Sequence, residues 1–129
     1  MNQTNNVLTL NNLLLSIAGY GTNIREDILL DNIISKGNIL DKQVKRYLGV
    51  AGQCHLNSTY LWNQNRESFQ LCTGYALFEN VWYCHSWLID RTDNMIIDTN
   101  PALYETYFGY ELSNEDSEWL FNFLWKDFI

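Results

Sequence analysis

The stretch that decides the fold is residues 69–98, with the sequence FQLCTGYALFENVWYCHSWLIDRTDNMIID. It contains two typical turn sequences, Glu79-Asn80 and residues 91–94. These turns separate three segments that have the composition or the alternation of β-strands. These three segments are residues 69–78, 81–89 and 95–97. Because both connections are short, we expect the three strands to form an antiparallel meander.

Apolar residues at helical spacing predict helices on both sides of this meander. The expected helices are residues 7–18, a helix opened by an Asn23/Glu26 capping box and closed by Gly37, residues 42–48, residues 55–63, and residues 113–128 with Ser113 as N-cap. The tyrosine-rich residues 104–110 are expected to form a loop or to pack at the edge of the sheet. Helices combined with an antiparallel meander in this order define the α+β fold class.

The chain has 129 residues, and no linker rich in glycine, serine or proline divides it, so we predict a single domain. Hydrophobic residues make up 47% of the chain, which is enough to build a buried core. Within the domain we distinguish a helical N-terminal part over residues 1–51, a core over residues 52–112 and a C-terminal helix over residues 113–129.

The charge balance limits the partners of the protein. Fifteen acidic residues against eight basic ones give a net charge of -7, so we expect neither nucleic acid nor an anionic membrane as a partner. The three cysteines are an odd number, and the polar N-terminal sequence lacks an export signal. We therefore expect a cytoplasmic protein with reduced thiols. The sequence leaves the oligomeric state open.

Cys54 is the candidate nucleophile. It follows Gly52-Gln53 and stands at the start of a predicted helix, where unpaired backbone N–H groups and the helix dipole favour a thiolate. The glycine would let a substrate approach closely, and an oxyanion would be bound by the backbone of this turn or by the side chain of Gln53.

His85 and Asp98 are the candidate base and its orienting group. His85 lies in the second strand on the same face as Trp87, which would form a wall beside it. Asp98 follows the third strand. If the turn is centred near Thr92-Asp93, these strands pair so that positions 85 and 98 fall nearly side by side, and the carboxylate would then hold the imidazole.

Each of these residues also has a simpler interpretation. Cys54 would be an inert core residue, and His85 a core histidine that is hydrogen-bonded to Asp98 without any chemistry. Three cysteines and two histidines would also suit zinc, but no pair of cysteines has C-x-x-C spacing, so we expect no metal and no other cofactor. Cys72 and Cys84 are interpreted as packed strand residues, and His55 as a surface or structural residue, with support of the site as the alternative.

Four short motifs, taken in order, resemble the core of the transglutaminase-like branch of the papain-like cysteine protease superfamily. They are Gly52-Gln53-Cys54, Cys72-Thr73-Gly74-Tyr75-Ala76, His85-Ser86-Trp87 and Ile97-Asp98-Thr99. The chain differs from the family pattern in having Ser86 where alanine is usual and Asn100-Pro101 after the threonine. The resemblance covers residues 52–99 and leaves the N-terminal helices and the C-terminal helix unexplained.

The resemblance implies a papain-like core in which a Cys54-His85-Asp98 triad acts without a metal. Such an enzyme is a protease, a deamidase or a transglutaminase-like acyl transferase, depending on whether water or an amine accepts the acyl group, and its substrate is a protein or peptide. The alternative is an acidic binding or inhibitor protein on the same fold, which would use the aromatic C-terminal helix.

Overall fold

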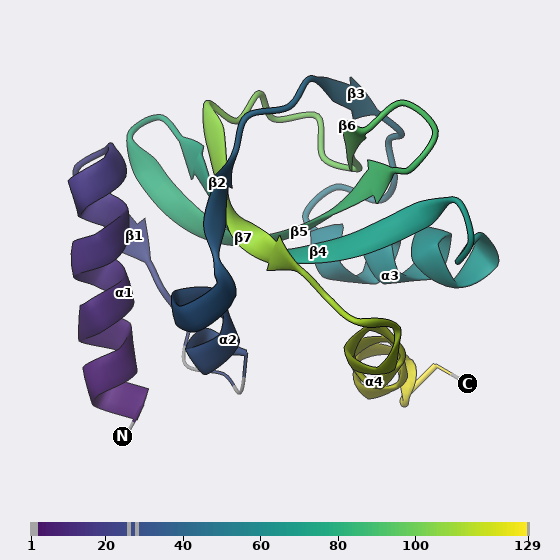
Figure 1. Cartoon of the computed structure of the whole chain (residues 1–129), viewed down its shortest axis with the longest axis horizontal. Helices are drawn as coiled ribbons and strands as arrows, with labels where there is room; N and C mark the ends of the chain where they lie inside the picture. The colour runs from purple at the N-terminus through teal and green to yellow at the C-terminus, as the bar shows by residue number, and fades with distance from the viewer. Residues whose placement is uncertain (1–2, 26, 28, 129) are drawn as a thin grey trace. The chain divides into compact units, whose positions relative to one another are not determined.

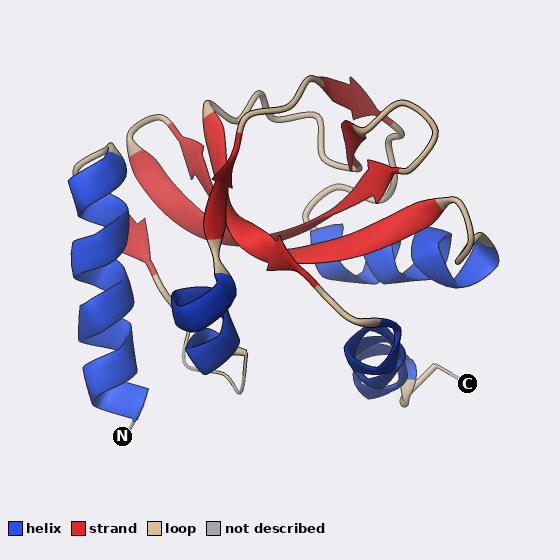
Figure 2. Cartoon of the chain, in the orientation of Figure 1, coloured by secondary structure: helices blue, strands red, loops and turns tan. Residues whose placement is uncertain are grey.

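The structure is a computed structural model that describes residues 3–25, 27 and 29–128. Within these residues it contains four helices and a seven-stranded sheet, so the fold is α+β as predicted (Figures 1 and 2). The elements in chain order are α1 (Gln3–Ile17), β1 (Gly21–Asn23), α2 (Leu30–Lys36), β2 (Asn38–Leu40), β3 (Val44–Arg46), α3 (Cys54–Gln64), β4 (Phe69–Phe78), β5 (Val81–Asp90), β6 (Met95–Asp98), β7 (Thr106–Glu111) and α4 (Asn114–Trp125).

The strands follow the order β2-β7-β4-β5-β6-β3, and β1 pairs with β5 beside this path. The predicted meander of β4, β5 and β6 is confirmed, and β5 pairs with β6 in the antiparallel sense. Glu79 and Asn80 have φ angles of 49° and 68°, the left-handed conformation that a two-residue hairpin turn requires at both positions.

The chain divides into two compact units. The first consists of the described residues of 1–41 together with 74–85 and 102–110, and the second consists of residues 42–73, 86–101 and the described residues of 111–129. Both β4 and β5 contribute residues to each unit, so the units alternate along the chain instead of following one another.

The first unit is built around α1, which packs against α2 and β1 (Figure 1). Leu10 and Leu14 of α1 and Leu30 and Ile33 of α2 are fully buried, because each helix turns its apolar face inward. Trp82 of β5 is also fully buried, and its indole N–H donates to the carbonyl of Ala18 at 2.9 Å.

In the second unit α3 packs against α4. Trp62 of α3 is buried with its ring centroid 6.5 Å from that of Phe121, and the indole N–H of Trp125 donates to Thr59 Oγ1 at 3.0 Å. The predicted start of the C-terminal helix is confirmed, since Ser113 Oγ accepts a hydrogen bond from the backbone N–H of Asp116 at 3.0 Å.

Two helix predictions were wrong. Asn23 ends strand β1 instead of opening a helix, and α2 begins only at Leu30; Glu26 lies outside the described residues. The segment expected as a helix over residues 42–48 contains strand β3. In both cases a parallel partner far along the chain, β5 for β1 and β6 for β3, outweighs the local helical signal.

The segment over residues 104–110 also differs from expectation, because most of it belongs to strand β7, which lies between β2 and β4 in the sheet. Tyr107, Phe108 and Tyr110 are buried. A strand that is covered on both faces lacks the polar alternation that identifies a half-exposed strand, so its pattern is uninformative. Among the helices of the described residues, none is both long and apolar enough to cross a lipid bilayer.

Gly74 lets β4 and β7 approach closely, and this explains the glycine of the second motif. A Cβ at this position would overlap the backbone carbonyl of Phe108. We expect Gly74→Ala to lower the free energy of unfolding by about 3 kcal/mol, because the strands must separate. Gly21→Ala is the matched control, since its Cβ would meet only Val81 methyl groups at 3.3 Å and should change stability by less than about 1 kcal/mol. Urea denaturation measures both, and an equal effect of the two would contradict the close approach.

Candidate active site

Cys54 is the first residue of α3, the helix-start position that the sequence predicted, and it is half-buried. The residues before it form an open turn. Gly52 has a φ of 77°, in the left-handed region that favours glycine, and a Cβ there would have no neighbour within 4 Å. Gln53 is exposed, and its side chain makes no capping hydrogen bond to the helix. A ligand therefore has room to reach the start of α3.

A network of hydrogen bonds fixes this turn from both sides. The backbone N–H of Gln53 donates to the carbonyl of Val50 at 3.2 Å. The Asn57 amide holds the same residue at two points, accepting from Val50 N at 3.2 Å and donating to Val50 O at 2.8 Å. Because Asn57 lies one turn into α3, the helix itself positions the segment that leads to Cys54.

Ser86 attaches the first turn of α3 to β5. The Ser86 hydroxyl lies 2.5 Å from His55 Nδ1 and 3.0 Å from Thr73 Oγ1, and the Ser86 carbonyl accepts from the Ser58 hydroxyl at 3.2 Å. Ser58 is four residues after Cys54 and shares its helix face. Ser86 therefore attaches α3 to β5, and His55 is one of the residues that make this contact.

Asp98 is the last residue of β6 and is fully buried. One of its carboxylate oxygens accepts from the backbone N–H of Asn100 at 2.9 Å. The pairs Leu88–Ile97 and Asp90–Met95 centre the hairpin on Thr92-Asp93, so the predicted register is confirmed. Extending this register by one residue places Trp87, which is also fully buried, opposite Asp98.

His85 lies in β5 and is 1% exposed. Its ring centroid is 4.5 Å from that of Tyr104 and 6.2 Å from that of Tyr107. Both tyrosines belong to the segment for which the sequence offered no role, so these neighbours of the imidazole were missed. A fixed aromatic surrounding holds the ring of His85 in one orientation.

The five predicted site residues divide between the two units. Cys54, Gln53, Trp87 and Asp98 belong to the second unit, whereas His85 belongs to the first and immediately precedes Ser86 in the chain. Sequence reasoning missed Asn57, which bonds the irregular segment just before its helix, and the attaching role of Ser86, which acts through contacts with other segments of the chain. The only signal for Ser86 was that it stands where the family that the sequence resembles usually has alanine.

The other two cysteines differ from Cys54. Cys72 is fully buried in β4, and burial raises the pKa of its thiol well above the usual range. Cys84 is half-buried beside Tyr75, whose hydroxyl pKa burial likewise raises. Neither cysteine forms a disulfide, and among residues 3–25, 27 and 29–128 no cluster of three or more histidine, cysteine or acidic side chains could hold a metal ion.

No model of a known protein family matches this chain, and no curated protein or solved structure is significantly similar to it.

Ser86 offers a direct test of how α3 is held. We expect Ser86→Ala to lower the free energy of unfolding by about 1 to 3 kcal/mol, because it removes a buried hydroxyl that His55 and Thr73 share. Ser16→Ala, which removes an exposed hydroxyl bonded to a carbonyl of its own helix, should change stability by less than about 0.5 kcal/mol. Denaturation followed by circular dichroism compares the two, and a neutral Ser86→Ala would show that this contact does not hold the helix.

Proposed function

We propose that this protein is a cysteine-dependent amide hydrolase or acyl transferase with a transglutaminase-like core. In this proposal Cys54 is the nucleophile, His85 the base and Asp98 the group that orients the base. The observation that carries it is the position of Cys54 at the head of α3, behind the open turn at Gly52. The order of a nucleophile helix followed by an antiparallel meander supports the family resemblance.

The register of β5 and β6 supports the pairing of His85 with Asp98. Extended by one residue, this register places Trp87 opposite Asp98, and His85 shares its face of β5 with Trp87.

The reaction follows from these roles. The imidazole of His85 takes the thiol proton, and the thiolate of Cys54 attacks an amide carbonyl of a protein or peptide. The tetrahedral intermediate collapses when its C–N bond breaks and His85 returns the proton to the leaving amine. The resulting thioester then passes its acyl group to water, which gives a hydrolase, or to a second amine, which gives a transferase.

The oxyanion of the intermediate needs a hydrogen-bond donor near Cys54. The backbone N–H of Gln53 already donates to Val50, so we assign this role to the Gln53 carboxamide, which is exposed and makes no capping bond. Trp87 is buried, so its role is to support Asp98 from the neighbouring strand.

Alkylation by iodoacetamide at neutral pH tests the nucleophile. We expect Cys54 to be labelled at least about tenfold faster than Cys72, because the Cys72 thiol is buried and its pKa is raised. His85→Ala should slow the labelling of Cys54 by about tenfold or more, because it removes the base. His55→Ala is compared as the other histidine of the chain; since it also removes the contact to Ser86 that attaches α3, circular dichroism must first show that the variant is folded. Peptide mass spectrometry gives the rate at each cysteine.

Slow and equal labelling of all three cysteines would contradict the proposal, as would a rate that depends on His55 and not on His85. The reaction itself is found by comparing a cell lysate treated with the wild-type protein or with Cys54→Ala. Cleavage products, deamidated glutamines or new cross-links that appear only with the wild type identify the acceptor.

The exposed aromatic face of α4 favours a second candidate, a non-catalytic acidic binding protein. Trp119 and Phe123 stack with ring centroids 5.3 Å apart and are 39% and 50% exposed, an arrangement that costs stability unless a partner covers it. In this case a pull-down from lysate should retain its partner in Cys54→Ser and lose it in Trp119→Ala. A partner that is lost in Cys54→Ser instead would favour the enzyme.

A further inference from the structure

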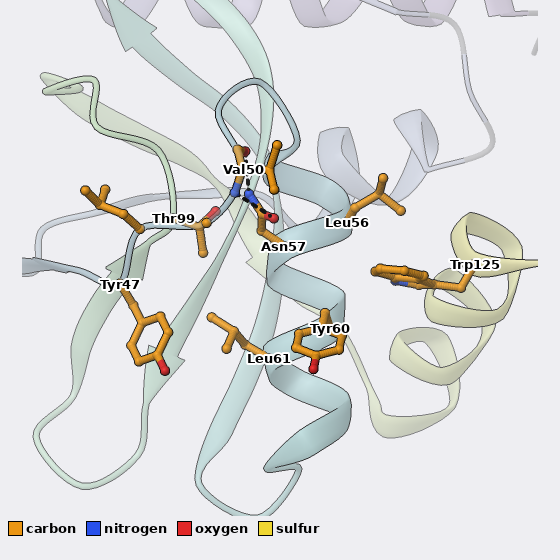
Figure 3. A pocket seen from close by; sticks show the side chains of 10 residues that line it. Tyr47, Val50, Leu56, Asn57, Tyr60, Leu61, Thr99 and Trp125 are labelled. Carbon is orange, nitrogen blue, oxygen red and sulfur yellow. Dashed lines mark hydrogen bonds between the residues drawn. The ribbon is translucent and has the colours of Figure 1, made fainter. Parts of the chain in front are cut away.

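A pocket of about 360 Å³ opens on the second unit beside the start of α3 (Figure 3). Its walls come from the segment after β3, from one side of α3, from the residue after β6 and from α4. The lining residues are Tyr47, Leu48, Gly49, Val50, Leu56, Asn57, Tyr60, Leu61, Thr99 and Trp125.

The lining is apolar and carries no charged residue. Three of its polar groups are already engaged, because the Asn57 amide is bonded to Val50, the Trp125 indole N–H to Thr59 and the Tyr60 hydroxyl to Gln64. The Thr99 hydroxyl is buried and has no hydrogen-bond partner among the described residues. Around the opening, Tyr47, Leu48 and Val50 are 62%, 61% and 68% exposed. Large apolar side chains gathered at the mouth of a pocket mark a binding site for an apolar group.

Backbone hydrogen bonds connect this pocket to two of the proposed catalytic residues. At one end, Tyr47 N donates to Asp98 O at 3.1 Å and Gly49 N to Thr99 O at 3.0 Å. At the other end, the bond from Gln53 N to Val50 O closes a turn, which keeps the α-carbons of these two residues within about 7 Å of each other. Cys54 follows directly, so the segment that forms one wall of the pocket is bonded to the backbone of Asp98 at one end and leads to Cys54 at the other.

We infer that this pocket binds an uncharged aromatic side chain of the substrate, next to the carbonyl that Cys54 attacks. This inference rests on the proposed function. An apolar protein cavity of roughly 150 Å³ accepts benzene, so a pocket of about 360 Å³ has room for an aromatic ring and the chain that carries it. A lining without charge offers an ionic side chain no partner, which selects a neutral group.

The test uses two iodoacetamides that differ only in the group on the amide nitrogen, 2-phenylethyl or 2-hydroxyethyl. Each labels Cys54 by forming an S–C bond as the C–I bond breaks and iodide leaves, and each rate is normalised to the reaction of the same reagent with glutathione. We expect the phenylethyl reagent to label Cys54 about tenfold faster than the hydroxyethyl reagent, because only its ring enters the pocket.

Val50→Arg and Leu48→Arg place a charge at the mouth of the pocket on exposed side chains, so they should fold and should reduce the normalised ratio to about one. Leu103→Arg is the matched control, because Leu103 is 75% exposed and is not part of the lining. It should keep the tenfold preference. A preference that survives both mouth variants would overturn the pocket assignment.

The outcomes separate the two proposals. A ratio of one, together with rapid labelling by iodoacetamide that depends on His85, overturns the pocket and leaves the proposed function intact. Slow labelling of Cys54 by every reagent, with or without His85, overturns both. A tenfold preference that the mouth variants abolish supports an aromatic substrate side chain.

Discussion

The candidate site depends on one buried serine that joins three elements. The Ser86 hydroxyl in β5 meets His55 of α3 and Thr73 of β4, and its carbonyl receives the Ser58 hydroxyl one helical turn later. Polar groups in a dry interior are tolerated only when they are paired, so these contacts specify one position of the helix on the strand. A register shift of β5 by one residue would turn Ser86 to the opposite face and break every one of them.

The same principle extends to the segment before α3. The chain from Tyr47 to Cys54 contains two glycines and little regular structure, yet it is tied to β6 by backbone bonds and to α3 through Asn57. Such a segment loses little conformational freedom when a ligand binds, because folding has already fixed it. The arrangement suits a nucleophile that must meet its substrate in one geometry.

The parts of the fold that sequence could predict are those with strong local signals. Strands β4, β5 and β6 are separated by recognisable turns, and Ser113 caps α4 through a bond within its own helix. The three-residue strands β1, β2 and β3 could not be predicted, because each exists only through a partner elsewhere in the sheet. Val44, for example, pairs with Ile96, and no local pattern encodes that distance.

The residues of the candidate site show the same difference between local features, which the sequence reveals, and long-range features, which it does not. Cys54 at a helix start and Asp98 at a strand end were predictable, because a glycine turn and a hairpin register are local features. Asn57 and the apolar pocket were not, since they arise when the segment after β3 meets α3 and α4. The positions of Cys54 and Asp98 in the fold were therefore predictable from the sequence, whereas the pocket beside α3 was not.

The ends of the strand order have a consequence for the behaviour of the protein at high concentration. The strand order of the sheet ends in β2 on one side and in β3 on the other, and each of these strands is three residues long. An unpaired strand edge can pair with another chain, and short terminal strands are one of the ways in which natural sheets limit this. The long, apolar strands β4 and β5 lie inside the strand order and not at its ends. The terminal strands therefore offer another chain only a short stretch of backbone with which to pair.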